Sequence, residues 1–271
     1  MIEFRNVYFS YNGKRYVLKN VSLEIKRGEA VAVIGENGAG KTTLLKHLNG
    51  LLKPTKGAVL VGGKDTRKCS VAELSRTVGL IFQNPNHQLF AETVWDEVAF
   101  ALRNFNYPSD VIRKRVEYVL RLFDLYEYKD RSPYELSGGE RKRLAIASVL
   151  AYDPEVIAFD EPTIGQDYYQ KQTLGQYIKL LKTQGKTIVT VTHDMEFVAE
   201  NFEKVVLLSR GEVVACGSAR EVLTNKSLLE KHGLLAPQLT ELAYELSDYG
   251  FPRDILTLEE AYRAIKRVLE V

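Results

Sequence analysis

Cysteine is scarce in this sequence. Cys69 and Cys216 are the only two cysteines among 271 residues, and they lie far apart without a CxxC or Cys/His spacing. A disulfide framework and a cysteine-based metal site are therefore not expected. Both thiols are predicted to be reduced, as is typical of a cytosolic protein.

Long apolar runs are missing as well. No run approaches the roughly 20 residues that a helix needs to cross a bilayer. Residues 1–11, MIEFRNVYFSY, carry charged side chains where a signal peptide would have its apolar segment. If the protein works at a membrane, we expect another chain to hold it there.

An excess of one charge is also absent. The chain has 37 basic and 35 acidic side chains and a net charge of +2, so no overall attraction to nucleic acid or anionic lipid is expected. The basic run 113–115 could form a nucleic-acid patch, but we favour a solvated helix face. Hydrophobic residues make up 45% of the chain, which supplies a packed core and argues against disorder.

What the sequence does have is an alternation of short β-branched runs with longer helical patterns. Such an alternation predicts an α/β fold with a mostly parallel central sheet, covered by helices on both faces. The runs expected as buried strands are 31–34, 78–82, 156–159, 187–192 and 204–208. Near the N-terminus, two further strands flank a turn signal at Asn12-Gly13 and predict an antiparallel pair.

Helical patterns dominate two other parts of the chain. Between Gln83 and Asp153, an amphipathic stripe follows a helix start at Pro108 and Ser109. Its members are Ile112, Val116, Val119, Leu120 and Phe123.

The second helical part follows Gly217. Leucines predict a short helix that opens near Pro237, residues 248–254 read as a linker, and Thr257 with Glu260 predicts a capping box for a last helix. The apolar faces of these helices could fold back on the core or pack on a partner, and we favour the partner.

These patterns predict the domain organisation. We expect one domain over residues 1–217, with an N-terminal antiparallel β subdomain and a helical subdomain inserted at about 86–152. A small C-terminal helical extension would cover residues 218–271.

A glycine-rich segment predicts a phosphate-binding loop. It reads GENGAGKTT and matches G-x-x-x-x-G-K-[ST] between a predicted strand and a predicted helix, which disfavours a chance glycine turn. Its backbone N–H groups and the helix N-terminus can face phosphate oxygens. Lys41 would reach the β- and γ-phosphates, and the Thr42 hydroxyl would hold Mg²⁺. The expected nucleotide-binding residues are Gly35, Glu36, Asn37, Gly38, Ala39, Gly40, Lys41, Thr42 and Thr43.

Polar residues follow three of the predicted strands, at the edge where open α/β sheets bind ligands. Asp160 is expected to bind Mg²⁺, and Glu161 to polarise an attacking water as general base. Gln83 could coordinate Mg²⁺ or position water, and His193 could contact the γ-phosphate. Taken singly, the glutamine is uninformative and a lone histidine is usually structural. An acidic loop start is the alternative for Asp160 and Glu161, but two acids directly after four apolar residues disfavour it.

The order of these motifs together with LSGGE resembles an ATP-binding cassette ATPase over about residues 1–217. The LSGGE residues are Leu136, Ser137, Gly138, Gly139 and Glu140. Ser137 can cap the helix that follows, and the two glycines leave its N-terminal N–H groups open to an anion. In the family those groups meet the γ-phosphate held by a second cassette. The resemblance therefore implies an ATP-hydrolysing P-loop cassette that works as a homo- or heterodimer with ATP and Mg²⁺.

The resemblance also carries over to single positions. Tyr11 is similar to the aromatic residue that stacks on adenine, and Gln83 to the glutamine that contacts Mg²⁺ and opens the loop facing a membrane partner. Glu161 is similar to the catalytic glutamate, and His193 to the switch histidine. Asp167 is similar to the aspartate of the loop that joins two cassettes.

One departure concerns that joining loop. The family pattern DEPTAGLD reads DEPTIGQD here, so that Ile164 and Gln166 replace a small residue and a leucine. Because Asp167 remains, we still expect hydrolysis. The altered loop puts in doubt whether two identical copies make the best pair.

The segment after Gln83, NPNHQLFAETVWDEVAFAL, resembles the ATPase subunits of energy-coupling factor importers and of the related cobalt and nickel importers. This narrower resemblance implies docking on a transmembrane subunit, peripheral attachment to the cytoplasmic face of the cell membrane, and uptake of a vitamin or a transition-metal ion, without nucleic acid as a partner. Residues 235–271 also resemble an extra C-terminal helical piece that helps to pair the two ATPases, so the extension over residues 218–271 is expected to serve dimerisation. The plainer interpretation of Leu89, Phe90, Val94 and Trp95 as core residues stays open beside it.

Two rival functions remain. A soluble cassette ATPase could use the same motifs as a nucleotide-gated clamp on a ribosome or DNA, although one cassette without a heptad array does not favour that. An ordinary P-loop kinase or GTPase has no use for LSGGE, and no guanine-reading NKxD is present.

Overall fold

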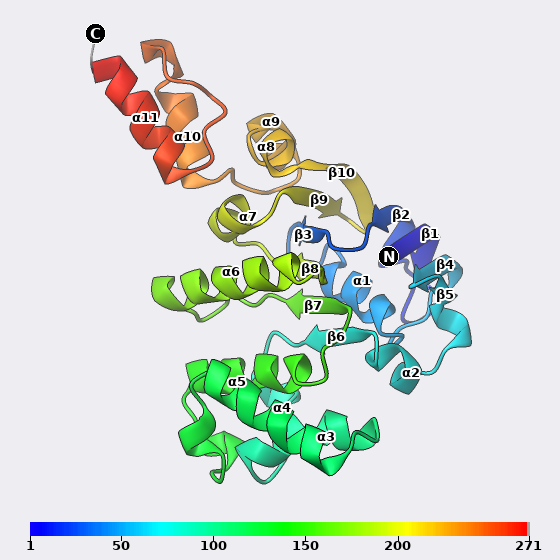
Figure 1. Ribbon diagram of the computed structural model, residues 1–271. Coiled ribbons are helices and arrows are strands. Elements are labelled where there is room, and N and C mark those ends of the chain that lie inside the picture. The colour runs from blue at the N-terminus through cyan, green and yellow to red at the C-terminus, as the bar shows by residue number, and fades with distance from the viewer. Residues whose placement is uncertain (270–271) are drawn as a thin grey trace.

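The computed structural model describes residues 1–269, and its central element is a twisted six-stranded sheet with the strand order β10-β9-β3-β8-β7-β6 (Figure 1). Neighbouring strands from β9 to β6 pair in parallel, and β10 pairs antiparallel with β9 at one edge. The strands are β3 (Ala30–Ile34), β6 (Val78–Ile81), β7 (Val156–Asp160), β8 (Thr187–Val191), β9 (Lys204–Ser209) and β10 (Glu212–Ser218). The five predicted core strands are thus confirmed, whereas β10 was not predicted.

Burial on both faces explains why these strands are continuously apolar. In β3, Ala32 and Ile34 belong to one hydrophobic cluster, and the alternate residues Val31 and Val33 belong to a second cluster on the other face. Because successive side chains of a strand point to opposite faces, both sets must be apolar.

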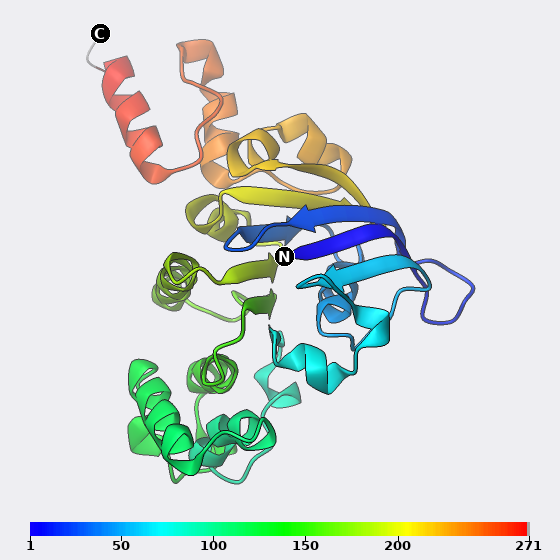
Figure 2. The same ribbon diagram turned by 45° about the vertical axis from the view of Figure 1, so that its right-hand side comes forward.

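A four-stranded antiparallel sheet in the order β2-β1-β4-β5 covers the second cluster (Figure 2). Its strands are β1 (Ile2–Phe9), β2 (Leu18–Ile25), β4 (Lys56–Val61) and β5 (Lys64–Asp65). The predicted antiparallel pair is confirmed, with Phe4 opposite Leu23. The turn signal at Asn12-Gly13 lies inside a longer connection than a tight hairpin, since residues 10–17 separate the two strands.

Helices fill the segments between strands. In the sheet regions they are α1 (Lys41–Leu48), α2 (Val71–Ser75), α6 (Tyr168–Thr183) and α7 (Met195–Asn201). Between β6 and β7 lie α3 (Val94–Asn104), α4 (Ser109–Leu122) and α5 (Gly138–Leu150), and at the C-terminal end lie α8 (Ala219–Leu223), α9 (Lys226–Lys231), α10 (Gln238–Glu245) and α11 (Leu258–Leu269). Within residues 1–269, no helix combines the length and the apolar character that a bilayer span requires.

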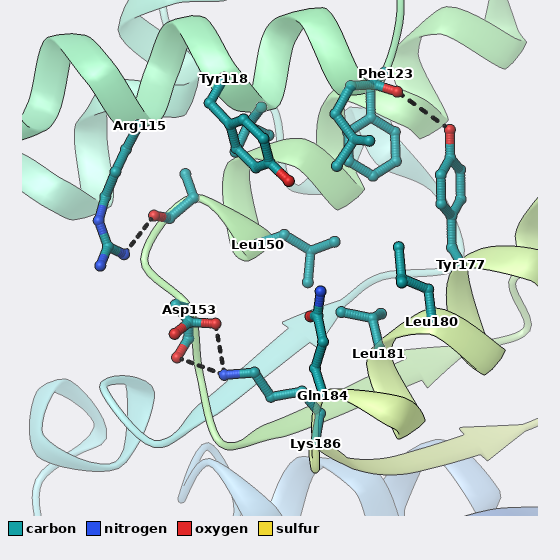
Figure 3. Close-up of a pocket in the computed structure, with 13 residues that line it drawn as sticks. Arg115, Tyr118, Phe123, Leu150, Asp153, Tyr177, Leu180, Leu181, Gln184 and Lys186 are labelled. Carbon is teal, nitrogen blue, oxygen red and sulfur yellow. Dashed lines mark hydrogen bonds and ion pairs between the residues drawn. The ribbon is translucent and has the colours of Figure 1, made fainter.

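The helical region α3–α5 projects from the β6 side of the large sheet (Figure 1). Its helices share the first hydrophobic cluster, in which Leu102, Leu120, Phe123 and Leu144 are fully buried. A cavity of about 500 Å³ separates α4 and the end of α5 from α6 (Figure 3). At one side of that cavity, the Tyr177 hydroxyl donates to the Leu122 carbonyl at 3.5 Å.

The C-terminal helices divide into two groups. α8 and α9 pack on the large sheet, because Val222, Leu223 and Leu229 are part of its cluster. α10 and α11 lie beyond them, at the opposite end of the molecule from α3–α5 (Figures 1 and 2). They enclose a small separate cluster of Ala243, Phe251, Ile255, Ala261 and Ala264.

Two predicted features of this end are confirmed. α10 begins directly after Pro237. The Thr257 hydroxyl accepts from the Glu260 N–H at 3.3 Å, and the Glu260 carboxylate accepts from the Thr257 N–H at 3.2 Å, as a capping box requires.

Candidate nucleotide site

The glycine-rich loop runs from the end of β3 to the start of α1, as its motif predicts. Gly40 stands before the first helical residue with a φ of 105°, a conformation that glycine adopts without strain. A Cβ on Gly35 would lie 2.1 Å from the Leu208 carbonyl oxygen, so only glycine allows the loop to pass β9 this closely. The loop therefore presents backbone rather than side chains at the N-terminus of α1, which favours an anion.

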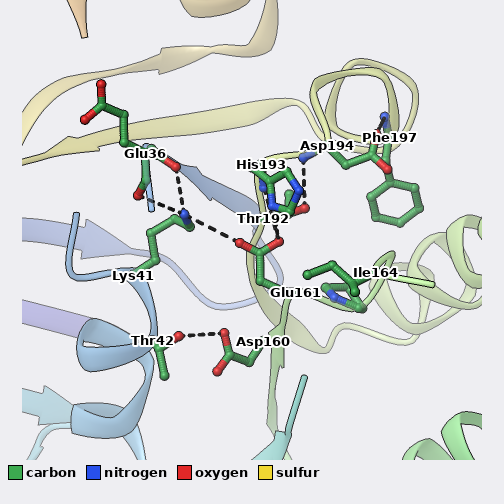
Figure 4. A network of polar contacts seen from close by, with 12 residues as sticks. Glu36, Lys41, Thr42, Asp160, Glu161, Ile164, Thr192, His193, Asp194 and Phe197 are labelled. Carbon is green, nitrogen blue, oxygen red and sulfur yellow. Dashed lines mark hydrogen bonds and ion pairs between the residues drawn. The ribbon is translucent and has the colours of Figure 1, made fainter. Parts of the chain in front are cut away.

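Lys41 is folded over this loop (Figure 4). Its Nζ donates to the carbonyls of Gly35 at 2.7 Å and Glu36 at 3.2 Å, and it lies 3.5 Å from Glu161 Oε1. Only 6% of the residue is exposed. A buried ammonium held largely by backbone carbonyls is ready to exchange them for a stronger anionic acceptor such as phosphate.

Asp160 ends β7 and faces α1. Its Oδ1 accepts from the Thr42 hydroxyl at 2.9 Å (Figure 4). Burial raises the pKa of the Asp160 carboxyl, and the neighbouring Glu161 charge adds to the rise, while the Thr42 hydrogen bond opposes it. Mg²⁺ prefers oxygen ligands, and a carboxylate beside a hydroxyl supplies them. The charge of the ion would also offset the free-energy cost of burying the carboxylate. The residues present therefore fit the predicted magnesium site.

Glu161 follows in a left-handed conformation with a φ of 47°, which is costly for a residue with a side chain. Its backbone N–H donates to the Val191 carbonyl at 2.9 Å. Its Oε2 accepts from the His193 backbone N–H at 3.2 Å and makes a 2.9 Å contact with His193 Nδ1. The end of β8 thus holds the carboxylate from one side and Lys41 holds it from the other (Figure 4).

Lys41, Thr42 and Glu161 share one cavity of about 230 Å³ with Gln83, whereas Asp160 and His193 lie outside its lining. Its lining residues are Val17, Glu36, Asn37, Gly38, Gly40, Lys41, Thr42, Thr43, Gln83 and Glu161. The structure thus brings Gln83, from the end of β6, to the glycine-rich loop. Val17 was missed, because a single apolar residue before a strand gives no functional signal.

Tyr11 stands at the open side of the loop. Its side chain is 62% exposed, its hydroxyl lies 3.1 Å from Thr43 Oγ1, and its ring packs edge-on against Phe9. The position leaves a ring face available beside the predicted phosphate site, as stacking on a base requires.

The LSGGE segment does not reach this cavity. Ser137 caps α5, accepting from the Glu140 N–H at 3.3 Å while the Glu140 carboxylate accepts from the Ser137 N–H at 2.7 Å. None of the residues 136–140 lines the cavity. Asp167 likewise caps a helix, accepting from the Gln170 N–H at 2.8 Å at the start of α6. Both motifs therefore lie outside the lining of the nucleotide cavity of their own chain.

The segment after Gln83 divides between core and surface. Leu89 and Val94 are buried, whereas Phe90 is 57% exposed and stacks edge-on with the exposed Phe100 at 4.7 Å. Beneath them the buried Glu97 carboxylate accepts from the N–H groups of Phe90 and Ala91, both at 2.8 Å, and burial raises the pKa of this carboxyl. Glu97 fixes the turn that presents Phe90, and its role was not foreseen.

Comparison with known proteins decides the family. The family model described as ABC transporter matches residues 18–164. The chain belongs to this family. It is an α/β cassette ATPase, as the motif order predicted. A putative ABC transporter ATP-binding protein of Pyrococcus horikoshii is 46% identical over 255 residues, which cover 94% of this chain and 96% of the relative.

Other relatives of this ABC cassette carry narrower names. An energy-coupling factor transporter ATP-binding protein, EcfA1, of Caldanaerobacter subterraneus subsp. tengcongensis is 42% identical and covers 98% of this chain and 99% of its own. Some relatives are longer: the chain spans 40% of a putative ABC transporter ATP-binding protein of Methanosarcina mazei at 44% identity, covering 86% of this chain.

Solved structures agree with this fold. The structure of cbiO1 from Clostridium perfringens, described as part of the ABC transporter complex cbiONQ, has a TM-score of 0.77 and 32% identity, covering 91% of this chain and 98% of its own. A dimeric ATP-binding cassette in a post-hydrolysis state, bound to ADP and Pi, has a TM-score of 0.74 and 34% identity, covering 81% of this chain and 99% of its own.

Proposed function

We propose that this chain is the ATP-hydrolysing subunit of an energy-coupling factor type importer. It would be held at the cytoplasmic face of the cell membrane by a transmembrane subunit and drive uptake of a vitamin or a transition-metal ion such as cobalt. The observation that supports this most is the near full-length similarity to a relative named as an energy-coupling factor ATPase. The exposed Phe90 and Phe100 supply an apolar surface where a partner helix could dock.

Binding of ATP would begin at the glycine-rich loop. Its N–H groups and the start of α1 take the phosphates, Tyr11 stacks on the adenine, and Lys41 turns from Glu161 to the β- and γ-phosphates. Thr42, Asp160 and Gln83 would hold Mg²⁺, which when bound neutralises charge on the phosphates. The exchange at Lys41 leaves the Glu161 carboxylate free on that side.

Glu161 would then act as general base. It takes a proton from the water that attacks the γ-phosphate, and the contact from His193 Nδ1 keeps its Oε2 oriented. His193 is half-exposed, so its other ring nitrogen can face the phosphate. The site is complete only when residues 137–139 of a second cassette, identical or related, close over the γ-phosphate, with Asp167 at the junction and α10–α11 adding contacts.

The test uses the full chain with its membrane. We expect a membrane subunit to stay bound to the tagged protein in detergent extracts of its host, and the double variant Phe90→Asp with Phe100→Asp to lose that subunit while keeping ATP binding. The matched control is Tyr118→Asp, an exposed aromatic on α4, which should retain it. Recovery of ribosomes or DNA, with no membrane protein that depends on Phe90, would contradict the proposal.

A further inference from the structure

Lys142 has contacts that the mechanism above does not use. It lies in the second turn of α5, behind the helix tip that Ser137 caps. Its Nζ donates to the Ile164 carbonyl, and to the Pro162 carbonyl at 3.3 Å. Both acceptors belong to the loop that connects Glu161 to α6, so one side chain ties the LSGGE helix to the loop that starts at the proposed base.

The helix tip touches the far end of the same loop. A Cβ on Gly139 would lie 2.8 Å from Gln170 Nε2, so the first turn of α5 packs directly on this side chain. Gln170 in turn exchanges two hydrogen bonds with Asp167, its N–H donating at 2.8 Å and its Oε1 accepting at 3.2 Å. Lys142 and Gln170 therefore brace α5 against both ends of the loop.

The loop transmits position to Glu161 over a short distance. The Ile164 N–H donates to the Glu161 carbonyl at 3.4 Å, so the residue that Lys142 holds is also bonded to the residue that carries the carboxylate. Lys171, in the first turn of α6, forms an ion pair with Asp194 at 2.6 Å. Asp194 is the residue that follows His193 in the sequence. Movement of the loop would thus alter the surroundings of Glu161 from two sides.

The other end of α5 is held by other elements: Gln88 Nε2 donates to the Ala145 carbonyl at 2.8 Å, and Arg115 donates to the Ala151 carbonyl at 3.1 Å. There the cavity of about 500 Å³ separates α5 from α6 (Figure 3). The Lys142 ammonium is half-buried against backbone carbonyls, and burial lowers the pKa of its amino group. Burying an ammonium group costs free energy, and its hydrogen bonds to carbonyl oxygens offset that cost. Such a side chain is suited to fixing the position of the main chain.

We propose that Lys142 is a positioning residue that couples the two nucleotide sites of a cassette pair. It links the α5 tip, which meets the nucleotide of the second cassette, to the loop that begins at Glu161 of its own chain. When the tip closes on the nucleotide of the second cassette, the loop then fixes the position of Glu161 at the nucleotide site of its own chain. This inference rests on the proposed function, because it requires two cassettes that share their nucleotides.

The test is a series at position 142 in the full chain. Lys142→Met removes the N–H donors but keeps a side chain of similar length. Lys142→Gln keeps an amide donor on a shorter side chain, and Lys142→Arg keeps a positively charged donor on a long side chain. Lys114→Met, an exposed lysine on α4, is the matched control. Turnover is measured against ATP concentration, together with the equilibrium Kd for a fluorescent ATP analogue and the Tm.

The methionine variant should keep its Kd within about 2-fold, lose about 10-fold in kcat, and show a Hill coefficient falling from near two toward one, the limit for uncoupled sites. Arginine should restore both parameters, and glutamine should fall between. Wild-type kcat and cooperativity in the methionine variant would overturn the inference alone, and so would a loss that arginine does not rescue. Absence of turnover and of ATP-driven pairing in the wild-type chain, both alone and together with any cassette that co-purifies with it, would overturn the proposed function as well.

Discussion

The nucleotide site and the α10–α11 unit are held together in opposite ways. Segments far apart in sequence converge on the site, and its charged residues are buried: Lys41, Asp160 and Glu161 are each no more than 6% exposed. The α10–α11 unit is local in sequence, and its cluster contains three alanines, one isoleucine and one phenylalanine. Polar contacts attach it to α8 and α9, among them the ion pairs of Arg220 with Glu260 and of Lys226 with Glu241. The Tyr244 hydroxyl also donates to the Thr224 carbonyl at 2.9 Å.

The surfaces of the two regions differ as well. α11 exposes Leu258 at 77%, Tyr262 at 66% and Ile265 at 42%, which follow one another at i, i+4 and i+7 along one helix stripe. Such a stripe on a small unit favours a partner surface. Catalytic chemistry needs a site that the whole fold holds in place, whereas an apolar contact surface needs only a small local unit.

The largest effect is expected at the site. Glu161→Gln should bind ATP with unchanged affinity, because the amide keeps the volume of the carboxylate, but lose about 10³-fold in kcat, since the amide cannot accept the proton from water. An ATP-bound pair should then accumulate, which sedimentation with ATP would detect. A variant that sediments only as a monomer with saturating ATP would contradict a nucleotide shared between two copies of this chain.

A pair of phenylalanines tests whether the two regions are separate folding units. Phe123→Ala should lower the free energy of unfolding of the cassette by about 3–5 kcal/mol, because the ring is fully buried in the main cluster. Phe251→Ala should loosen α10–α11 alone, with ATP hydrolysis and the main unfolding transition unchanged. Hydrogen exchange would locate the loss, and global destabilisation by Phe251→Ala would show that the regions fold as one.

The same contrast explains what the sequence could predict. β3 and β7 were predictable because burial on both faces demands unbroken apolar residues, and the helix starts at Pro237 and Thr257 because caps are local in sequence. β10 and α8 were not: an edge strand with partly exposed side chains has no apolar run, and a helix of one turn has no measurable period.

The site divides similarly. Gly35–Thr42, Asp160 and Glu161 were placed in advance, since their motifs are defined by backbone geometry at strand ends, although their individual roles stay predictions. The contact of Lys142 with Ile164 could not be foreseen, because its acceptors are carbonyl groups that every residue has. Val17 likewise reaches the cavity only through the tertiary fold.

Truncation should separate the two regions directly. The domain boundary expected after Gly217 would remove α8 and α9, which share the main cluster, so a cut there should destabilise the cassette. A cut after Pro237 keeps α8 and α9 and removes α10 and α11, together with Leu256 at the edge of the main cluster. In the Glu161→Gln background we expect that shorter chain to keep its ATP affinity and to weaken ATP-driven pairing about 10-fold. Sedimentation equilibrium measures this, and undiminished pairing would refute the dimerisation role.

The smallest effect is expected from substitutions in the exposed apolar stripe of α11, and this test is the most specific because it changes surface residues alone. Leu258→Ser with Tyr262→Ser leaves the alanines that pack on α10 in place, so the unit should stay folded and only its outer surface should change. If the stripe packs on a partner cassette, pairing should weaken several-fold, because each lost side chain removes about 1–2 kcal/mol of apolar burial before compensation. Arg263→Ser, exposed on the same helix, is the control. Equal pairing by all three chains would leave α10–α11 without a role in assembly and restrict the contact between copies to the nucleotide sites.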